Sequence, residues 1–350
     1  MKLLQIALPL FFALIVIQGC YRDEIIVPLV SSNSPHKLGV YVLSEGNGAP
    51  DQSKLSFLSY ANGEFSYNIT FPSVLGLYPD GITEYNATAI YITEQGSPGG
   101  EGKIYKLDTN GIIYSSNNFG LNPYSIAAVN DKAYCSNGPD SSVSVIDLNS
   151  LAEIKRIKTG LNPREIISLN NKVYVANTKY TGGGVDSTIS VINSLNDLQV
   201  AKIKIDIAPS SLAVSKDGYL LAGSSGHGGT IYKVSPNSYE IVNSYSVNSL
   251  VIGDINVDVN SNNIFFIKNY SSIMKLDLTS GELTTVIESS SSNNLLFING
   301  YSYDSKYKKH YLADAKDFNS AGFLYKFNSS GVLEAGFQTG ISPKKILIRN

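Results

Sequence analysis

The chain of 350 residues is poor in the residues on which metal and disulfide chemistry depend. It has no tryptophan, 2 cysteines, 2 methionines and 3 histidines. His36, His227 and His310 are too few and too scattered in the sequence for a multi-histidine metal centre. Cys135 is the only cysteine besides Cys20, which excludes an internal disulfide framework. Stability must therefore come from a packed core, in which we expect Cys135 to be a small buried residue.

Charged residues are also scarce. They make up 16% of the chain, and 27 basic residues nearly balance 29 acidic ones. No basic cluster of the length expected for a nucleic-acid surface is present, so we expect no nucleic-acid partner. The 23 tyrosines and 30 glycines, together with abundant Ser and Asn, favour strands and tight turns over helices.

The N-terminus indicates export. Lys2 precedes an apolar run from Leu3 to Ile17, which is too short for a stable membrane span and predicts a signal peptide. The stretch Ile17–Cys20, Ile-Gln-Gly-Cys, resembles the bacterial lipobox. This resemblance implies that residues 1–19 are removed and that Cys20 carries acyl chains, each buried CH₂ of which adds about 0.8 kcal/mol to membrane binding. The alternative is an ordinary signal peptide with an incidental cysteine.

Residues 20–37 are predicted to form a lipidated tether, and residues 38–350 the folded domain. Tyr21-Arg22-Asp23-Glu24 resembles the charged signal that sends some Gram-negative lipoproteins to the outer face of the outer membrane. We therefore expect a lipid-anchored outer-membrane protein at the cell surface. Placement in the periplasmic leaflet, with these charges acting only as a solvated tether, is the alternative.

The sequence repeats itself at intervals of about 40 residues. The segments 121–147 and 161–193 share a Leu-Asn-Pro turn and two strand-like runs, and their Pro123 and Pro163 are 40 residues apart. Each unit holds about four short β-branched or aromatic runs separated by Gly, Asn, Asp or Ser, which is typical of a four-stranded propeller blade.

Seven such units can be counted. The second strands are predicted at Val40–Leu43, Ala89–Thr93, Lys132–Cys135, Lys172–Ala176, Tyr219–Ala222, Ile264–Ile267 and His310–Ala313. The third strands are predicted at Lys54–Ser59, Lys103–Asp108, Ser142–Asp147, Thr188–Asn193, Thr230–Ser235, Ser272–Asp277 and Phe323–Asn328. The expected fold class is all-β, a seven-bladed β-propeller of four-stranded antiparallel blades.

The first unit lacks an innermost strand of its own. Ile341–Ile348 matches the pattern of a turn plus an innermost strand and has no blade after it. We expect this C-terminal strand to complete the first blade, which closes the ring and protects sheet edges from pairing with other chains. An open solenoid of sheets would show the same period and remains the alternative.

Two of these motifs resemble a known family. Val173–Asn177, Val-Tyr-Val-Ala-Asn, and Ser144–Asp147, Ser-Val-Ile-Asp, resemble the YVTN or YncE-type propellers, and the resemblance spans residues 40–348. The opening Tyr41–Asn47, followed by Leu55–Leu58, is similar to surface lipoproteins that sit on TonB-dependent outer-membrane receptors, including the cobalamin-capturing propellers. This resemblance implies a receptor partner and a corrinoid as candidate ligand.

The alternation of strand direction predicts which loops share an end of the ring. The turns before the innermost strands and the loops between second and third strands lie at one end, where polar and aromatic side chains gather around a central depression. The ligand-binding candidates are Glu45, Asn47, Tyr78, Glu94, Tyr124, Arg164, Tyr180, His227, Tyr270 and Asp314, with Gln95, Lys179 and Lys344 at the same end. The alternative is that these residues only solvate loop ends and satisfy backbone groups.

Three functions are open at this point. The first is non-catalytic capture of a nutrient, which needs no cofactor. A corrinoid is the first candidate, because a tyrosine-rich rim suits a large, flat, partly polar ligand. The second is a calcium-dependent lactonase-like hydrolase, which requires Glu45, Glu94 and Asp314 to converge. The third is a protein-interaction scaffold, which predicts a flat face without a pocket. Fold alone does not choose among them.

Overall fold

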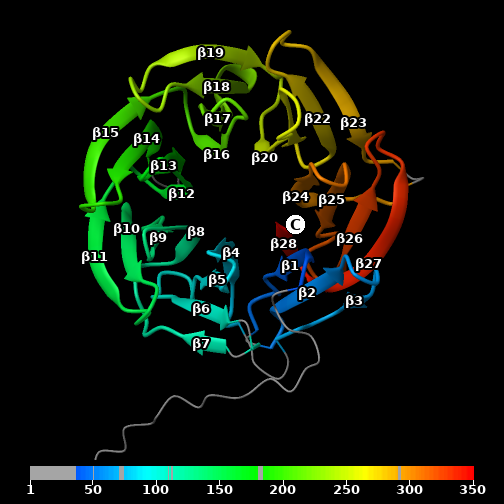
Figure 1. The fold of residues 1–350 in the computed structure, drawn as a ribbon, viewed down its shortest axis with the longest axis horizontal. Helices are drawn as coiled ribbons and strands as arrows, with labels where there is room; N and C mark the ends of the chain where they lie inside the picture. The colour runs from blue at the N-terminus through cyan, green and yellow to red at the C-terminus, as the bar shows by residue number, and fades with distance from the viewer. Residues whose placement is uncertain are drawn as a thin grey trace, which may run out of the picture.

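The chain forms a ring of seven four-stranded antiparallel sheets, so the predicted fold class is confirmed (Figure 1). The computed structural model describes residues 37–49, 51–70, 75–108, 110–111, 113–179, 184–290 and 293–350, apart from the side chain of His227. The predicted signal peptide, Cys20 and all of the tether except Lys37 lie outside the described residues. Within those residues no helix is long and apolar enough to cross a membrane.

Each blade runs from an innermost strand beside the channel to an outermost strand at the edge of the ring. From inside to outside, blade 1 contains β28 (Pro343–Arg349), β1 (Gly39–Ser44), β2 (Lys54–Ser59) and β3 (Phe65–Ser66). Blade 2 contains β4 (Pro79–Tyr85), β5 (Ala89–Glu94), β6 (Lys103–Asp108) and β7 (Ile113–Ser115). Blade 3 contains β8 (Pro123–Val129), β9 (Lys132–Asn137), β10 (Ser142–Asp147) and β11 (Glu153–Lys158). Blade 4 contains β12 (Pro163–Leu169), β13 (Lys172–Lys179), β14 (Val185–Asn193) and β15 (Leu198–Lys204).

The last three blades follow the same order. Blade 5 contains β16 (Pro209–Val214), β17 (Leu220–Ser224), β18 (Thr230–Val234) and β19 (Ile241–Ser246), with a 3₁₀ turn at Gly226–Gly228. Blade 6 contains β20 (Ile252–Val257), β21 (Asn263–Lys268), β22 (Ser272–Asp277) and β23 (Leu283–Glu288). Blade 7 contains β24 (Ile298–Asp304), β25 (Lys309–Asp314), β26 (Ala321–Phe327) and β27 (Leu333–Ile341). The predicted bounds of β2, β6, β10 and β22 are confirmed to the residue, and the others differ by one to three residues at an end.

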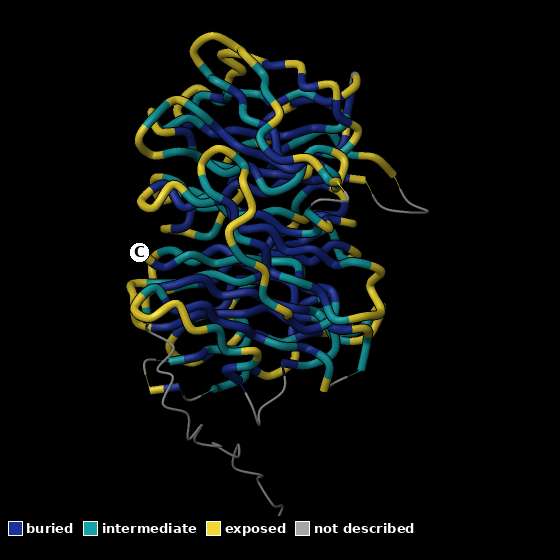
Figure 2. The backbone as a smooth tube through the Cα atoms, turned by 90° about the vertical axis from the view of Figure 1, so that its right-hand side faces the viewer, coloured by how far each residue is buried: buried dark blue, intermediate teal, exposed yellow. Residues whose placement is uncertain are grey.

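The core lies between adjacent blades. Between blades 4 and 5, for example, Tyr174, Leu212 and Leu220 belong to one buried cluster. Cys135 is a free, fully buried member of the equivalent cluster between blades 2 and 3, as predicted, and burial raises the pKa of its thiol. Figure 2 shows the buried segments running through the interior of the ring and the exposed ones at turns and outer edges. Buried side chains of the second strands thus pack one sheet onto the next.

The C-terminal strand closes the ring. β28 pairs with β1 along its whole length, from Gly39 opposite Arg349 to Ser44 opposite Pro343. Beyond the strand, the Glu45 backbone N–H donates to the Ser342 carbonyl at 3.1 Å. The predicted completion of the first blade by the last strand is therefore confirmed, and the open-solenoid alternative is wrong.

Candidate functional site

A β-bulge at the start of the innermost strands builds the site. In β12, Pro163 pairs with Asn177 and Ile166 with Val175, so that Arg164 and Glu165 together face one residue of β13. The same register shift occurs in β4 and β8, and such bulges re-aim side chains. In each of these innermost strands, the second and third residues therefore point in different directions.

We name these positions the first and second tiers. In blades 1 to 4 the first-tier residues are, in blade order, Lys344, Asp80, Tyr124 and Arg164. The second-tier residues with polar side chains are Ser125, Glu165, Ser211, Asp254 and Lys345, from blades 3, 4, 5, 6 and 1. Tyr124, Arg164 and Lys344 of the first tier line a cavity at one end of the ring, whereas four of the second-tier residues line a separate space in the channel.

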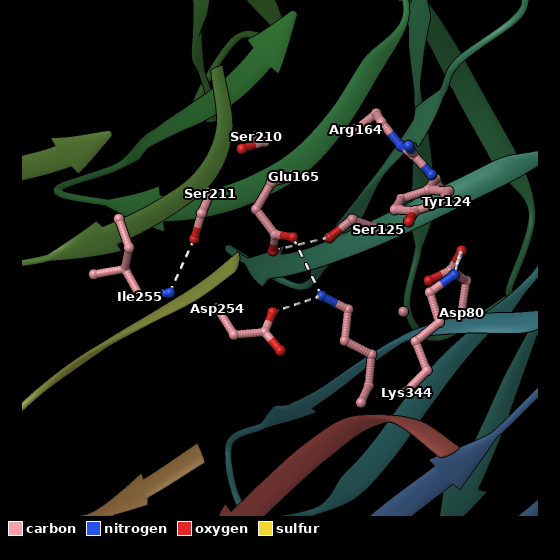
Figure 3. A network of polar contacts seen from close by, with 12 residues as sticks. Asp80, Tyr124, Ser125, Arg164, Glu165, Ser210, Ser211, Asp254, Ile255 and Lys344 are labelled. Carbon is pink, nitrogen blue, oxygen red and sulfur yellow. Dashed lines mark hydrogen bonds and ion pairs between the residues drawn. The ribbon is translucent and has the colours of Figure 1, made fainter. Parts of the chain in front are cut away.

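The first-tier side chains contact one another in the order of the blades. The Lys344 Nζ lies 2.8 Å from Asp80 Oδ2 and 4.8 Å from the centre of the Tyr124 ring. The guanidinium carbon of Arg164 lies 4.0 Å from the same ring centre. Figure 3 shows Tyr124 between Arg164 and the Lys344–Asp80 pair. One aromatic ring of blade 3 thus contacts two cationic side chains, one from blade 1 and one from blade 4.

Hydroxyl groups of the preceding blades fix this arrangement. The Thr93 hydroxyl accepts the Gly81 N–H at 2.9 Å and donates to the Tyr124 carbonyl at 2.8 Å. The Ser136 hydroxyl likewise accepts the Ser125 N–H at 3.1 Å and donates to the Arg164 carbonyl at 2.6 Å. Each bulge is therefore tied to the next blade, which orients Tyr124 and Arg164 before any ligand binds.

The cavity has a volume of about 460 Å³, within the usual range for small-molecule sites. Loops of blades 1 to 4 form its walls. It is lined by Glu45, Tyr78, Gln95, Gly96, Pro98, Gly99, Asn122, Tyr124, Gly138, Pro139, Asn162, Pro163, Arg164, Lys179 and Lys344. We call it the rim cavity.

Lys344 is held in its charged form at the floor of the rim cavity. Burial alone would lower its pKa, but the carboxylate of Asp80, the Tyr124 side chain and the carboxylate of Glu45 outweigh burial and raise it. Glu45 Oε2 lies 3.1 Å from the Lys344 Nζ, and the Glu45 Oε1 accepts a hydrogen bond from the Ser342 hydroxyl at 3.3 Å. The charges of Glu45 and Lys344 are therefore satisfied within the protein.

The second tier forms an ion-pair network across the channel. The Lys345 Nζ lies 3.3 Å from Glu165 Oε2 and 3.3 Å from Asp254 Oδ1. The Ser125 hydroxyl donates to Glu165 Oε1 at 3.4 Å (Figure 3). Burial disfavours the charge of Lys345, but Asp254 and Glu165 outweigh it and raise its pKa. The closing strand thereby connects to blades 4 and 6 by side chains as well as to β1 by its backbone.

Four of the predicted site residues come together. Glu45, Tyr78, Tyr124 and Arg164 all line the rim cavity, as the alternation of strand direction predicts. Asn47 is an exposed loop residue that does not line the cavity. Tyr270 stacks on Phe297 with ring centres 4.5 Å apart and is also outside the cavity lining. Tyr180 and the side chain of His227 lie outside the described structure.

Glu94 and Asp314 satisfy backbone groups instead of facing a ligand. Each pairs with the first residue of the innermost strand, Glu94 with Pro79 and Asp314 with Ile298. Glu94 Oε1 accepts the backbone N–H groups of residues 77 and 96, and the Asp314 carboxylate accepts those of residues 296, 297 and 316. Both carboxylates are buried. They clamp the turn before the innermost strand to its own blade.

This geometry does not give the convergence of Glu45, Glu94 and Asp314 that the alternative hydrolase hypothesis requires. In the described part of the chain, no group of three or more His, Cys, Asp or Glu side chains could hold a metal ion. The physical reason is that Glu94 and Asp314 point at the N–H groups of separate turns in blades 2 and 7. The three-carboxylate calcium site of the hydrolase hypothesis is not present among the described residues.

Several cavity residues are absent from the predicted ligand-binding set. Asn122 and Asn162 belong to the repeated Leu-Asn-Pro turn, where both adopt a left-handed backbone conformation with φ of 43° and 45°. The Asn162 amide donates to the Lys179 carbonyl at 2.7 Å. Their signal in the sequence is the repeat itself, which marks the turn before each innermost strand. The position directly after the proline of that turn identifies Lys344 in the same way.

Comparison with known proteins supports the fold alone. No protein-family model matches the chain, and no curated protein matches its sequence. A quinonprotein alcohol dehydrogenase-like protein from Bacteroides thetaiotaomicron superimposes with a TM-score of 0.69 at 16% identity, covering 91% of this chain and 80% of the other. A candidate 6-phosphogluconolactonase from Bacteroides fragilis gives 0.67 at 12% identity, covering 91% and 100%.

A third solved structure, the hydrazine synthase of Kuenenia stuttgartiensis, gives a TM-score of 0.64 at 18% identity, covering 76% of this chain and 88% of the other. The neighbours thus include propellers of alcohol dehydrogenase-like and lactonase type. At such identities the likeness defines the class of this protein as a β-propeller and carries no activity over to it.

Proposed function

We propose that this protein is a cell-surface lipoprotein that captures a small nutrient in the rim cavity and passes it to a TonB-dependent outer-membrane receptor. A corrinoid, such as cobalamin, is the first candidate ligand. The observation that carries the proposal is the rim cavity, which joins four residues predicted from the sequence in one concave space with aromatic and polar walls. A scaffold with a flat face would lack such a space.

Exposed apolar side chains support the part of the proposal that concerns a receptor. Leu161, Ile207, Leu250 and Leu296 stand in the turns before the innermost strands of blades 4 to 7, at the end that carries the rim cavity. Their exposed fractions are 45%, 50%, 73% and 63%. A receptor-binding face at this end of the ring would have one exposed apolar side chain available from each of these four blades.

The lipid anchor is supported by the lipobox-like segment that ends at Cys20. In cells, Cys20→Ser is expected to release the protein from the membrane fraction, because Cys20 would carry the only acyl anchor. Unchanged membrane association of this variant in high salt would contradict the anchor.

Two tyrosines at the same end of the ring provide a test of the capture site. The Tyr78 hydroxyl packs so closely over Gly48 that a Cβ at residue 48 would lie 2.3 Å from it, and Tyr78 lines the rim cavity. Tyr270 is exposed at the same end but is outside the cavity lining. Residues 20–350 carrying Cys20→Ser are titrated with cyanocobalamin in a calorimeter. We expect Tyr78→Ala to weaken binding by roughly 2 kcal/mol and Tyr270→Ala to leave it unchanged.

The same titration separates the alternatives. Equal losses in Tyr78→Ala and Tyr270→Ala would place the ligand outside the rim cavity. The absence of heat with any corrinoid would contradict the candidate ligand, and hydrolysis of a lactone by the same preparation would favour the hydrolase. Melting temperatures of both variants control for loss of folding.

A further inference from the structure

Two cationic side chains of the rim cavity have no carboxylate partner. Lys344 is paired with Asp80 and Glu45. Arg164 and Lys179 also line the cavity and are exposed. Among the described residues, no carboxylate lies within ion-pair distance of either side chain. The rim cavity therefore carries an excess of positive charge on the wall formed by blade 4.

The stacking of Arg164 leaves its hydrogen-bond donors free. The guanidinium carbon lies 4.0 Å from the centre of the Tyr124 ring, and this cation–π contact is not a hydrogen bond to an acceptor atom. The donors of a guanidinium lie in its plane and form a fork that matches a carboxylate or a phosphate. In the part of the chain that the structure describes, the Arg164 side chain donates no hydrogen bond, and the Arg164 carbonyl accepts one from the Ser136 hydroxyl.

The backbone holds Arg164 in this position. The ring of Pro163, the preceding residue, fixes the φ of Pro163 itself, and the Ser136 hydroxyl donates to the Arg164 carbonyl at 2.6 Å. Tyr124 is in turn bound through its carbonyl by Thr93. A cation that is positioned before binding loses less entropy when it meets an anion, which favours specific recognition over diffuse attraction.

We propose that Arg164, assisted by Lys179, is an oxyanion-binding element of the rim cavity and that the captured ligand presents a phosphate or carboxylate group to it. This inference rests on the proposed function, since it concerns the same cavity, and it adds the chemical class of the ligand. The Lys344 charge is already paired with the carboxylates of Glu45 and Asp80. Arg164 is therefore the cation that would recognise an anionic group of the ligand. The phosphodiester of cobalamin belongs to this class.

Arginine side-chain NMR gives a direct test because the chain has only four arginines, Arg22, Arg156, Arg164 and Arg349. Residues 20–350 with Cys20→Ser, labelled with ¹⁵N, are titrated with phenyl phosphate, benzoate and neutral benzamide at constant ionic strength. Arg164→Lys assigns the signal. We expect the Nε–Hε signal of Arg164 to shift and saturate with at least one of the two anions and to stay in place with benzamide.

Two arginines act as internal controls. Arg156 is paired with Glu153 at 2.8 Å and Arg349 with Glu84 at 2.7 Å, so their signals should stay in place with every probe. A response to phenyl phosphate alone would assign the ligand group as a phosphate, and one to benzoate alone as a carboxylate. Equal shifts of Arg164 and Arg156, or a shift with benzamide, would overturn the proposal.

Variants separate this inference from the proposed function. We expect Arg164→Lys to weaken the affinity for the responding anion by about tenfold, because lysine lacks the bidentate fork, and Arg156→Lys to leave it unchanged. Cobalamin binding that leaves the Arg164 signal in place would support capture and overturn the oxyanion element. Anion binding at Arg164 without cobalamin binding would support the element and contradict the candidate ligand.

Discussion

Arg164 and Glu165 are consecutive residues of β12 whose side chains serve different parts of the molecule. The Arg164 guanidinium lies 4.0 Å from the Tyr124 ring centre at the rim cavity, whereas Glu165 Oε2 lies 3.3 Å from the Lys345 Nζ in the channel. The bulge between Pro163 and Ile166 causes this divergence. One irregularity, repeated around the ring, thus separates the side chains of the rim cavity from an ion-pair network in the channel.

The channel network makes Lys345 important for stability. In Lys345→Ala, the carboxylates of Glu165 and Asp254 lose their shared cation while they stay about four-fifths buried, with exposed fractions of 22% and 21%. We expect the free energy of unfolding to fall by about 2 kcal/mol, less than for a fully buried pair. Urea unfolding followed by circular dichroism measures it.

The exposed pair of Lys158 and Asp140 provides the control for this prediction. Lys158 is 76% exposed, so Lys158→Ala should change stability by less than about 1 kcal/mol. Lys345→Met combined with Glu165→Gln and Asp254→Asn should recover most of the loss, because no buried charge is left without a partner. Equal effects of Lys345→Ala and Lys158→Ala would contradict the network.

Removal of the closing strand should destabilise the whole ring. Deletion of residues 343–350 exposes the edge of β1, whose residues from Gly39 to Ser44 all pair with β28. Each buried backbone group left without a partner costs about 1 to 3 kcal/mol, and a domain has only roughly 5 to 15 kcal/mol in total. We expect a loss of cooperative melting in calorimetry. An unchanged melting temperature would contradict closure of the ring by β28.

His310 should make the protein sensitive to acid. Its ring is buried against Phe265, Tyr301 and Tyr303, and burial lowers its pKa from 6.5 to about 4. Above pH 6.5 the residue is neutral in both states. Between pH 6.5 and 4 the unfolded chain binds the proton first, so stability falls as pH falls, by up to about 3 kcal/mol.

His310→Gln provides the comparison for the acid effect. The imidazole Nδ1 lies 2.8 Å from the Tyr301 hydroxyl, and glutamine keeps a polar partner there without a titratable ring. Unfolding free energies measured from pH 7 to 4 should depend less on pH in His310→Gln. The same slope in both proteins would show that other groups cause the acid effect.

The clamp residues should contribute to stability without calcium. In Asp314→Ala the backbone N–H groups of residues 296, 297 and 316 lose their acceptor, so we expect a loss of about 1 to 3 kcal/mol. The melting temperature of the unmodified chain should be the same in calcium and in chelator. A rise of several degrees with calcium that Asp314→Ala abolishes would restore the metal-site hypothesis.

The fold could be predicted from the sequence because the repeat of about 40 residues defines the blades and their number. The turns before the innermost strands and the short strands that follow recur around the chain, with Leu-Asn-Pro in two of these turns, and the single unmatched strand at the C-terminus fits the single incomplete blade. Strand direction then brings Glu45, Tyr78, Tyr124 and Arg164 to one end, which the rim cavity confirms. These inferences need only periodicity and topology.

The roles of individual side chains could not be predicted in the same way. Glu94 and Asp314 are at the correct end of the ring, but their direction depends on the turn that each one clamps. Lys345 is next to Lys344 in an unbroken sequence pattern, and only the bulge sends it into the channel. A local irregularity of the backbone carries no signal in hydrophobic periodicity.

A crystal structure of residues 20–350 with Cys20→Ser, grown with cyanocobalamin, tests the central claim most directly. The account predicts ligand density in the rim cavity, against Tyr78 and with an anionic group at Arg164. Ligand density at the opposite end of the ring or on the outer strands, with an empty rim cavity, would contradict it.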